Sequence, residues 1–127
     1  MGSEMCIRDR NIALEKETGV VVSYIKAEAK AFPQIAKLWV FGSRLKGTNE
    51  PDSDLDIAIE LIKVPKELRN LYGDDFGYWM ASREKISVKF RTVCPWPLDL
   101  QWYAGETLTG NLHEYLRECS ELIYEKS

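Results

Sequence analysis

The 127-residue chain lacks several features that would assign it to a functional class at once. Its three cysteines are odd in number and widely spaced, which argues against a disulfide-rich secreted domain and favours the reducing cytoplasm. No apolar run approaches the roughly 18 residues that span a bilayer, so we expect no membrane partner. Neither sign of charge dominates, because 17 Lys and Arg face 20 Asp and Glu. This balance argues against a protein that coats nucleic acid, and we expect no direct nucleic-acid binding.

The composition is nevertheless that of a folded domain. Hydrophobic residues make up 45% of the chain and charged residues 29%, which is typical of globular proteins. Residues 1–10 resemble a leader left by cloning or sequence assembly, and they lack the apolar stretch of a secretory signal. We therefore expect one domain over residues 11–127.

Hydrophobic periodicity predicts the elements of a small α/β (α+β) domain. Three- and four-residue spacing predicts a helix over residues 11–32 and a C-terminal helix from Asn111, its N-cap, to about residue 123. We expect single short helices at 44–47 and after Pro65, and either a short helix or a loop at 73–80. Strands are predicted over residues 37–41, 54–62, 86–93 and 98–103. This order predicts a mixed β-sheet flanked by helices.

Two carboxylates mark the segment with the most chemical information. Asp54 and Asp56 are two residues apart on a predicted strand, so both side chains project from one face. Like charges at that separation repel by a few kcal/mol at an effective dielectric constant of about 20. A divalent cation removes this conflict, and hard oxygen ligands suit Mg²⁺ or Mn²⁺.

A tight turn that suits phosphate precedes the carboxylates. Gly42 permits close approach of the backbone, and N–H groups exposed at such a turn bind anions. Ser43 adds a hydroxyl donor, and Arg44 and Lys46 can neutralise phosphate charge. A phosphate cradle beside two carboxylates is the layout of metal-assisted nucleotidyl transfer.

Other interpretations of these residues fit less well. The run Gly42–Gly47 begins like a P-loop, but Thr48 stands where lysine is required. The acidic segment begins like an EF-hand, but Ile57 replaces the turn glycine and Lys63 the closing glutamate. A zinc site built from His113 and the cysteines has no recognised spacing. A solvated acidic loop remains possible, but it does not explain the Gly-Ser turn.

The run Phe41-Gly42-Ser43, ten residues, then Asp54-Leu55-Asp56-Ile57 resembles the signature of the DNA polymerase β-like nucleotidyltransferases. The short chain resembles their minimal nucleotidyltransferase branch over residues 36–126. The resemblance implies a third carboxylate, which Asp99 supplies, and a closing helix over residues 121–126. It further implies that three catalytic aspartates hold two Mg²⁺ ions, namely Asp54, Asp56 and Asp99. The residues that it implies contact the nucleotide are Gly42, Ser43, Arg44 and Lys46.

The same resemblance implies a reaction and a partner. Minimal nucleotidyltransferases are commonly the antitoxin halves of two-gene modules, paired with a helical HEPN-domain RNase toxin. This implies transfer of AMP from ATP to a tyrosine hydroxyl of the toxin. Two alternatives stay open, which are a small-molecule nucleotidyltransferase of the aminoglycoside type and an antitoxin that acts by binding without turnover. The chain departs from the family pattern over residues 64–93, which are longer and more aromatic than the resemblance implies, and the sequence assigns no role to the aromatic-rich segment 72–103.

Overall fold

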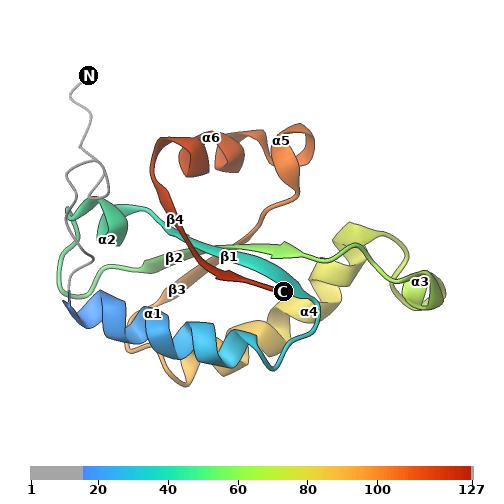
Figure 1. The fold of residues 1–127 in the computed structure, drawn as a ribbon, viewed down its shortest axis with the longest axis horizontal. Coiled ribbons are helices and arrows are strands. Elements are labelled where there is room, and N and C mark those ends of the chain that lie inside the picture. Colours follow the sequence, from blue (N-terminus) through green and yellow to red (C-terminus); the bar gives the residue numbers. More distant parts are fainter. Residues whose placement is uncertain (1–15, 127) are drawn as a thin grey trace.

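The computed structural model describes residues 16–126, so the leader expected over residues 1–10 lies outside the described residues. A four-stranded sheet in the order β3-β2-β1-β4 forms the centre (Figure 1). The strands are β1 (Ile35–Phe41), β2 (Leu55–Leu61), β3 (Leu98–Trp102) and β4 (Ser120–Glu125). β1 pairs antiparallel with both β2 and β4, whereas β3 runs parallel to β2. The predicted mixed sheet flanked by helices is confirmed.

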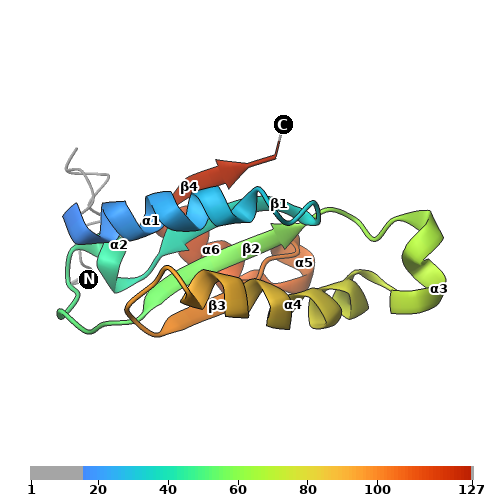
Figure 2. The same ribbon diagram turned by 90° about the horizontal axis from the view of Figure 1, so that it is seen from below.

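Two long helices cover one face of this sheet. α1 (Lys16–Ala29) and α4 (Asp75–Arg91) lie side by side below it in Figure 1, and Figure 2 shows them from that side. Ile25 of α1, Ile57 of β2 and Phe90 of α4 have no exposed surface and belong to one apolar cluster. Burying each such side chain contributes roughly 1.5–3 kcal/mol, so this layer holds most of the fold's stability.

The opposite face of the sheet is covered more thinly. In the described part of the chain only two short helices lie on it, α5 (Gly105–Leu108) and α6 (Gly110–Glu118) (Figure 1). Phe41, Ala58 and Leu112 form the small buried cluster there.

Short helices complete the molecule. α2 (Ser43–Lys46) follows β1, while the 3₁₀ helix η2 (Lys66–Leu68) and α3 (Arg69–Tyr72) project at one end of the molecule (Figure 2). None of the helices in the described part of the chain is both long enough and apolar enough to cross a bilayer.

The strand predicted over residues 86–93 is wrong, because residues 86–91 belong to α4 and residues 92 and 93 form the turn after it. Ile86, Val88 and Phe90 alternate in sequence, but Val88 is exposed whereas Ile86 and Phe90 are buried. The buried residues Trp79, Ser82, Ile86 and Phe90 follow three- and four-residue spacing, which is a helical stripe. A window of eight residues was too short to distinguish the two-residue period of a strand from the 3.6-residue period of a helix.

The C-terminal helix is also shorter than predicted. α6 ends at Glu118, and residues 120–125 form β4 instead of the closing helix implied by the resemblance. The backbone turns to extended geometry at Cys119, and β4 then pairs with the free edge of β1. This pairing joins distant segments, so local periodicity did not reveal it. Asn111 is not the N-cap either, because α6 begins at Gly110 and Thr109 precedes it.

Candidate functional site

The turn between β1 and α2 fits closely over one carboxylate. Gly42 has φ of 84°, a conformation that L side chains rarely adopt. A Cβ atom placed on Gly42 would overlap Oδ2 of Asp56 and lie 2.9 Å from its Cγ. Only glycine therefore allows the backbone of this turn to rest against the Asp56 side chain.

Two of the three predicted carboxylates face each other across neighbouring strands. Asp56 of β2 stands opposite Asp99 of β3 in the parallel register, and the two carboxyl groups share a hydrogen bond. The pKa of Asp56 is raised to about 7, most strongly by burial and then by the hydrogen bond with Asp99 and the charges of Asp99 and Asp54. Asp54 is exposed, directly before β2. The structure thus brings Asp54 and Asp99 within electrostatic reach of Asp56.

These carboxylates have the chemistry that a hard divalent cation requires. A hydrogen bond between two carboxyl groups needs a proton on one of them, and a bound cation can take the place of that proton. The donors are all oxygen, which suits Mg²⁺ or Mn²⁺. Across residues 16–126 no three ligand-type side chains are already gathered around one point.

Ser43 and Lys46 belong to α2, directly after the Gly42 turn. Ser43 is half-buried at the start of α2, and its hydroxyl makes no hydrogen bond within residues 16–126. Lys46 lines a hollow of about 200 Å³ together with Gly42, Tyr115 and Glu118. The serine hydroxyl is available for a ligand, and the lysine borders a space beside the same turn.

Arg44 does not face this space, although the sequence predicts it as a nucleotide contact. Its side chain is 1% exposed, and the guanidinium lies 3.5 Å from the ring centroid of Trp96. Nε donates to Ser53 O at 3.1 Å, Nη2 to Pro51 O at 3.0 Å and Nη1 to Thr18 Oγ1 at 3.3 Å. The role predicted for Arg44 is therefore not supported: it ties the loop between the turn and the carboxylates to the core.

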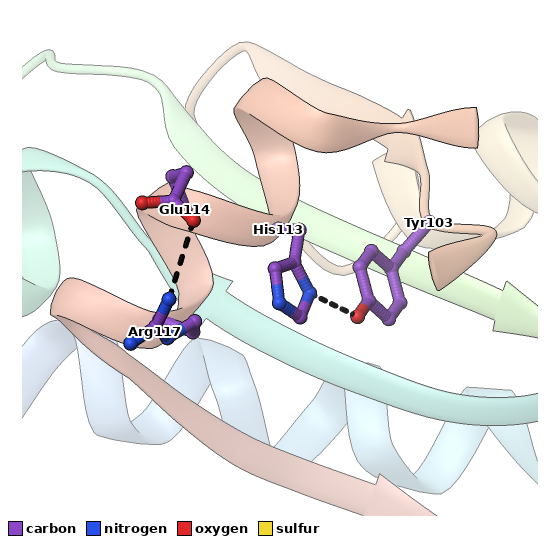
Figure 3. Close-up of polar contacts among 4 residues, drawn as sticks. All are labelled: Tyr103, His113, Glu114 and Arg117. Atoms are coloured by element: carbon purple, nitrogen blue, oxygen red, sulfur yellow. Dashed lines mark hydrogen bonds and ion pairs between the residues drawn. The ribbon is translucent and has the colours of Figure 1, made fainter. Parts of the chain in front are cut away.

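His113 forms a contact away from the carboxylates. Figure 3 shows its Nδ1 bonded to the Tyr103 hydroxyl at 2.7 Å, and the two rings are stacked at an interplanar angle of 8°. Tyr103 also packs edge-on against Trp39, at 5.2 Å between centroids. This half-buried pair joins α6 to the sheet.

One polar residue of the site, Gln101, was not predicted from the sequence. The Gln101 amide donates to Asp99 Oδ2 at 3.2 Å. Gln101 stands two residues after Asp99 on β3, so both side chains project from the same face. That spacing was visible in the sequence and was the signal that could have identified it.

Comparison with known proteins agrees with this geometry. Residues 22–125 match the family model described as "Nucleotidyltransferase domain". The chain belongs to that family. Nucleotidyltransferases of this family use a nucleoside triphosphate and a divalent metal, and the aspartates and the Gly42 turn of this nucleotidyltransferase suit both. A comparison with the curated proteins gives no match.

Two solved structures share the fold of this nucleotidyltransferase. One is described as a toxin-antitoxin with AMP-PNP, at 17% identity and a TM-score of 0.54, covering 84% of this chain and 74% of that one. The other is described as a mutant of the toxin-antitoxin MntA-HpeT, at 16% identity and a TM-score of 0.52, with the same coverage of 84% and 74%. At identities this low, the structural similarity shows a common fold alone.

Proposed function

We propose that this nucleotidyltransferase transfers AMP from ATP to a tyrosine hydroxyl of a partner toxin with a HEPN domain, and that it acts as the antitoxin of that pair. The observation that carries the proposal is the Asp56–Asp99 carboxyl pair lying against the Gly42 turn. The similar structures support the choice of partner and nucleotide, because both are toxin-antitoxin structures and one contains an ATP analogue.

Each residue of the site has a distinct role in this proposal. Asp54, Asp56 and Asp99 hold two Mg²⁺ ions, with Mn²⁺ as the substitute, and these ions supply Lewis-acid stabilisation of phosphate charge. The backbone at Gly42 and the hydroxyl of Ser43 bind the β- and γ-phosphates. Lys46 contributes positive charge beside that turn.

The reaction also needs an acceptor for the proton of the attacking hydroxyl. Asp99 is suited to this, because the Gln101 amide bonds to Oδ2 and fixes the carboxylate's orientation. The hydroxyl oxygen then bonds to the α-phosphorus, the bond from that phosphorus to the bridging oxygen breaks, and pyrophosphate leaves. Gln101 is thus a positioning residue that acts through Asp99.

The direct test uses ATP labelled on the α-phosphate. We expect label to pass to the protein encoded by the adjoining reading frame, with a mass gain of one AMP on a tyrosine. The Asp56→Asn variant should transfer none under the same conditions. Transfer by the variant at the wild-type rate, or no transfer to the neighbour by either protein, would contradict the proposal.

Nucleotide binding can be measured separately from transfer. A ligand at a hundredfold excess over its Kd stabilises the folded state by about 2.7 kcal/mol, so Mg²⁺ with a non-hydrolysable ATP analogue should raise the melting temperature by several degrees. Asp54→Asn should lose most of this shift. Equal shifts in both proteins would place the nucleotide elsewhere.

A further inference from the structure

A second hollow has Asp99 in its lining. It is a cleft of about 290 Å³ between α4 and β3. Arg83, Ser87 and Arg91 line it at four-residue intervals, so they form one stripe along α4. Asp99 lines the same cleft, together with Trp102. The cleft therefore opens directly beside the proposed proton acceptor.

The strand that borders this cleft has an unused edge. β3 is the terminal strand of the sheet, and no other strand within residues 16–126 pairs with its outer side. Pro97 O accepts from Leu55 N at 2.9 Å, and Tyr103 N donates to Ile59 O at 2.8 Å, so the odd-numbered residues of β3 bond to β2. Alternation then turns the N–H and C=O groups of the even-numbered residues, 98, 100 and 102, outward.

The arginines of the stripe carry charge that the described residues do not neutralise. Arg83 and Arg91 are exposed, and neither forms an ion pair within residues 16–126. Lys89, on the same helix, does find a partner, at 3.8 Å from Glu28. Two unneutralised guanidinium groups above an open strand edge are complementary to carboxylates on an extended chain.

We propose that this cleft binds an acidic, extended segment of the protein acceptor, which adds to the edge of β3 as a further strand and pairs its carboxylates with Arg83 and Arg91. The proposal rests on the proposed function in taking the acceptor to be a protein. A peptide satisfies the outward N–H and C=O groups in a regular ladder, which a nucleic-acid backbone does not. The added strand lies next to Asp99, so a hydroxyl on it is held near the carboxylate pair.

The first test measures binding with a defined probe, a fluorescein-labelled copolymer of Glu and Tyr, by anisotropy. Two exposed ion pairs of about 0.7 kcal/mol each correspond to roughly a tenfold change in Kd. We expect the double variant Arg83→Glu with Arg91→Glu to weaken binding about tenfold. Lys85→Glu, an exposed residue of the same helix outside the cleft, should leave Kd within about twofold.

The second test asks whether the probe adds a strand. In hydrogen exchange, the amides of Leu98, Leu100 and Trp102 should exchange rapidly in the free protein and slow when the copolymer binds. The amides of Asp99 and Gln101 already face β2, so they should be protected in both states and serve as internal controls.

The outcomes separate this proposal from the proposed function. Arginine-dependent binding with slowed exchange at residues 98, 100 and 102 supports strand addition, even where no AMP is transferred. Binding that the double variant leaves unchanged overturns it, even where AMP transfer proceeds. Binding that depends on the arginines while these amides stay unprotected, or displacement of the copolymer by single-stranded RNA at equal concentration, also overturns it.

Discussion

The two faces of the sheet differ in what they do for the molecule, and β2 contributes to both. Ile57 points into the layer formed with α1 and α4, has no exposed surface and packs in the main core. Its neighbour Asp56 points to the other face, where it meets Asp99 and the Gly42 turn. Adjacent residues of one strand therefore serve stability and chemistry separately. One side of the strand can be optimised for packing while the other keeps a repulsive pair of acids.

Removing one acid should give the largest effect and separate the two faces most clearly. Asp56→Asn removes the charge that the cation and the developing transition state require, so we expect nucleotidyl transfer to fall by at least about 10³-fold, or about 4 kcal/mol. The same change relieves repulsion in the metal-free protein, so its thermal stability should equal or exceed that of the wild type. Unfolding of the variant at a lower temperature would show that the carboxylate supports the fold.

The reciprocal change is Ile57→Ala, on the opposite side of the same strand. Truncating a fully buried isoleucine leaves a cavity and should cost about 2–5 kcal/mol of unfolding free energy, measured in urea. Activity per folded molecule should stay within severalfold of the wild type at a temperature where the variant is folded. A loss of activity comparable to that of Asp56→Asn would show that the faces are coupled.

Gly42 lies where the turn meets the carboxylates, and Gly73 provides a matched control. Both have positive φ, at 84° and 81°, but only Gly42 has Asp56 where a Cβ would go. Alanine at either position should cost about 1 kcal/mol of stability through backbone strain. Gly42→Ala should in addition displace Asp56 and abolish transfer, whereas Gly73→Ala should remain active. Equal activity in the two variants would show that the close approach of Gly42 to Asp56 is unnecessary.

A further expected effect is the dependence of stability on pH. The pKa of Asp56 rises from 3.8 to about 7 on folding, so the folded state favours the protonated acid. Stability that is present below pH 3.8 is then lost as the pH rises through about 7. In chelator, the melting temperature should fall more for the wild type than for Asp56→Asn between roughly pH 4 and pH 8. Parallel curves for the two proteins would contradict the raised pKa.

The sequence was informative where function depends on neighbours along the chain. The Gly42 turn and the Asp54–Asp56 spacing identified the site, because both are properties of short segments, and Asp99 followed from the family resemblance. The sequence was misleading where one local pattern fits both a helix and a strand. Residues 86–93 alternate and also fit a helix, and residues 120–125 fit a helical stripe until β1 offers them an edge. Arg44 carries the charge that phosphate requires, but only the fold reveals Trp96 beneath its guanidinium.

The parallel pairing of β2 and β3 also determines when the site can come into existence. Asp56 and Asp99 meet only after the chain has formed α4 and returned to the sheet, which is a contact distant in sequence. Such contacts form late, since they carry the entropy cost of closing a long loop. A chain emerging from the ribosome with β1 and β2 already paired has the glycine turn, Asp54 and Asp56, but it does not yet have Asp99 in place. We therefore expect a released intermediate without β3 to be inert.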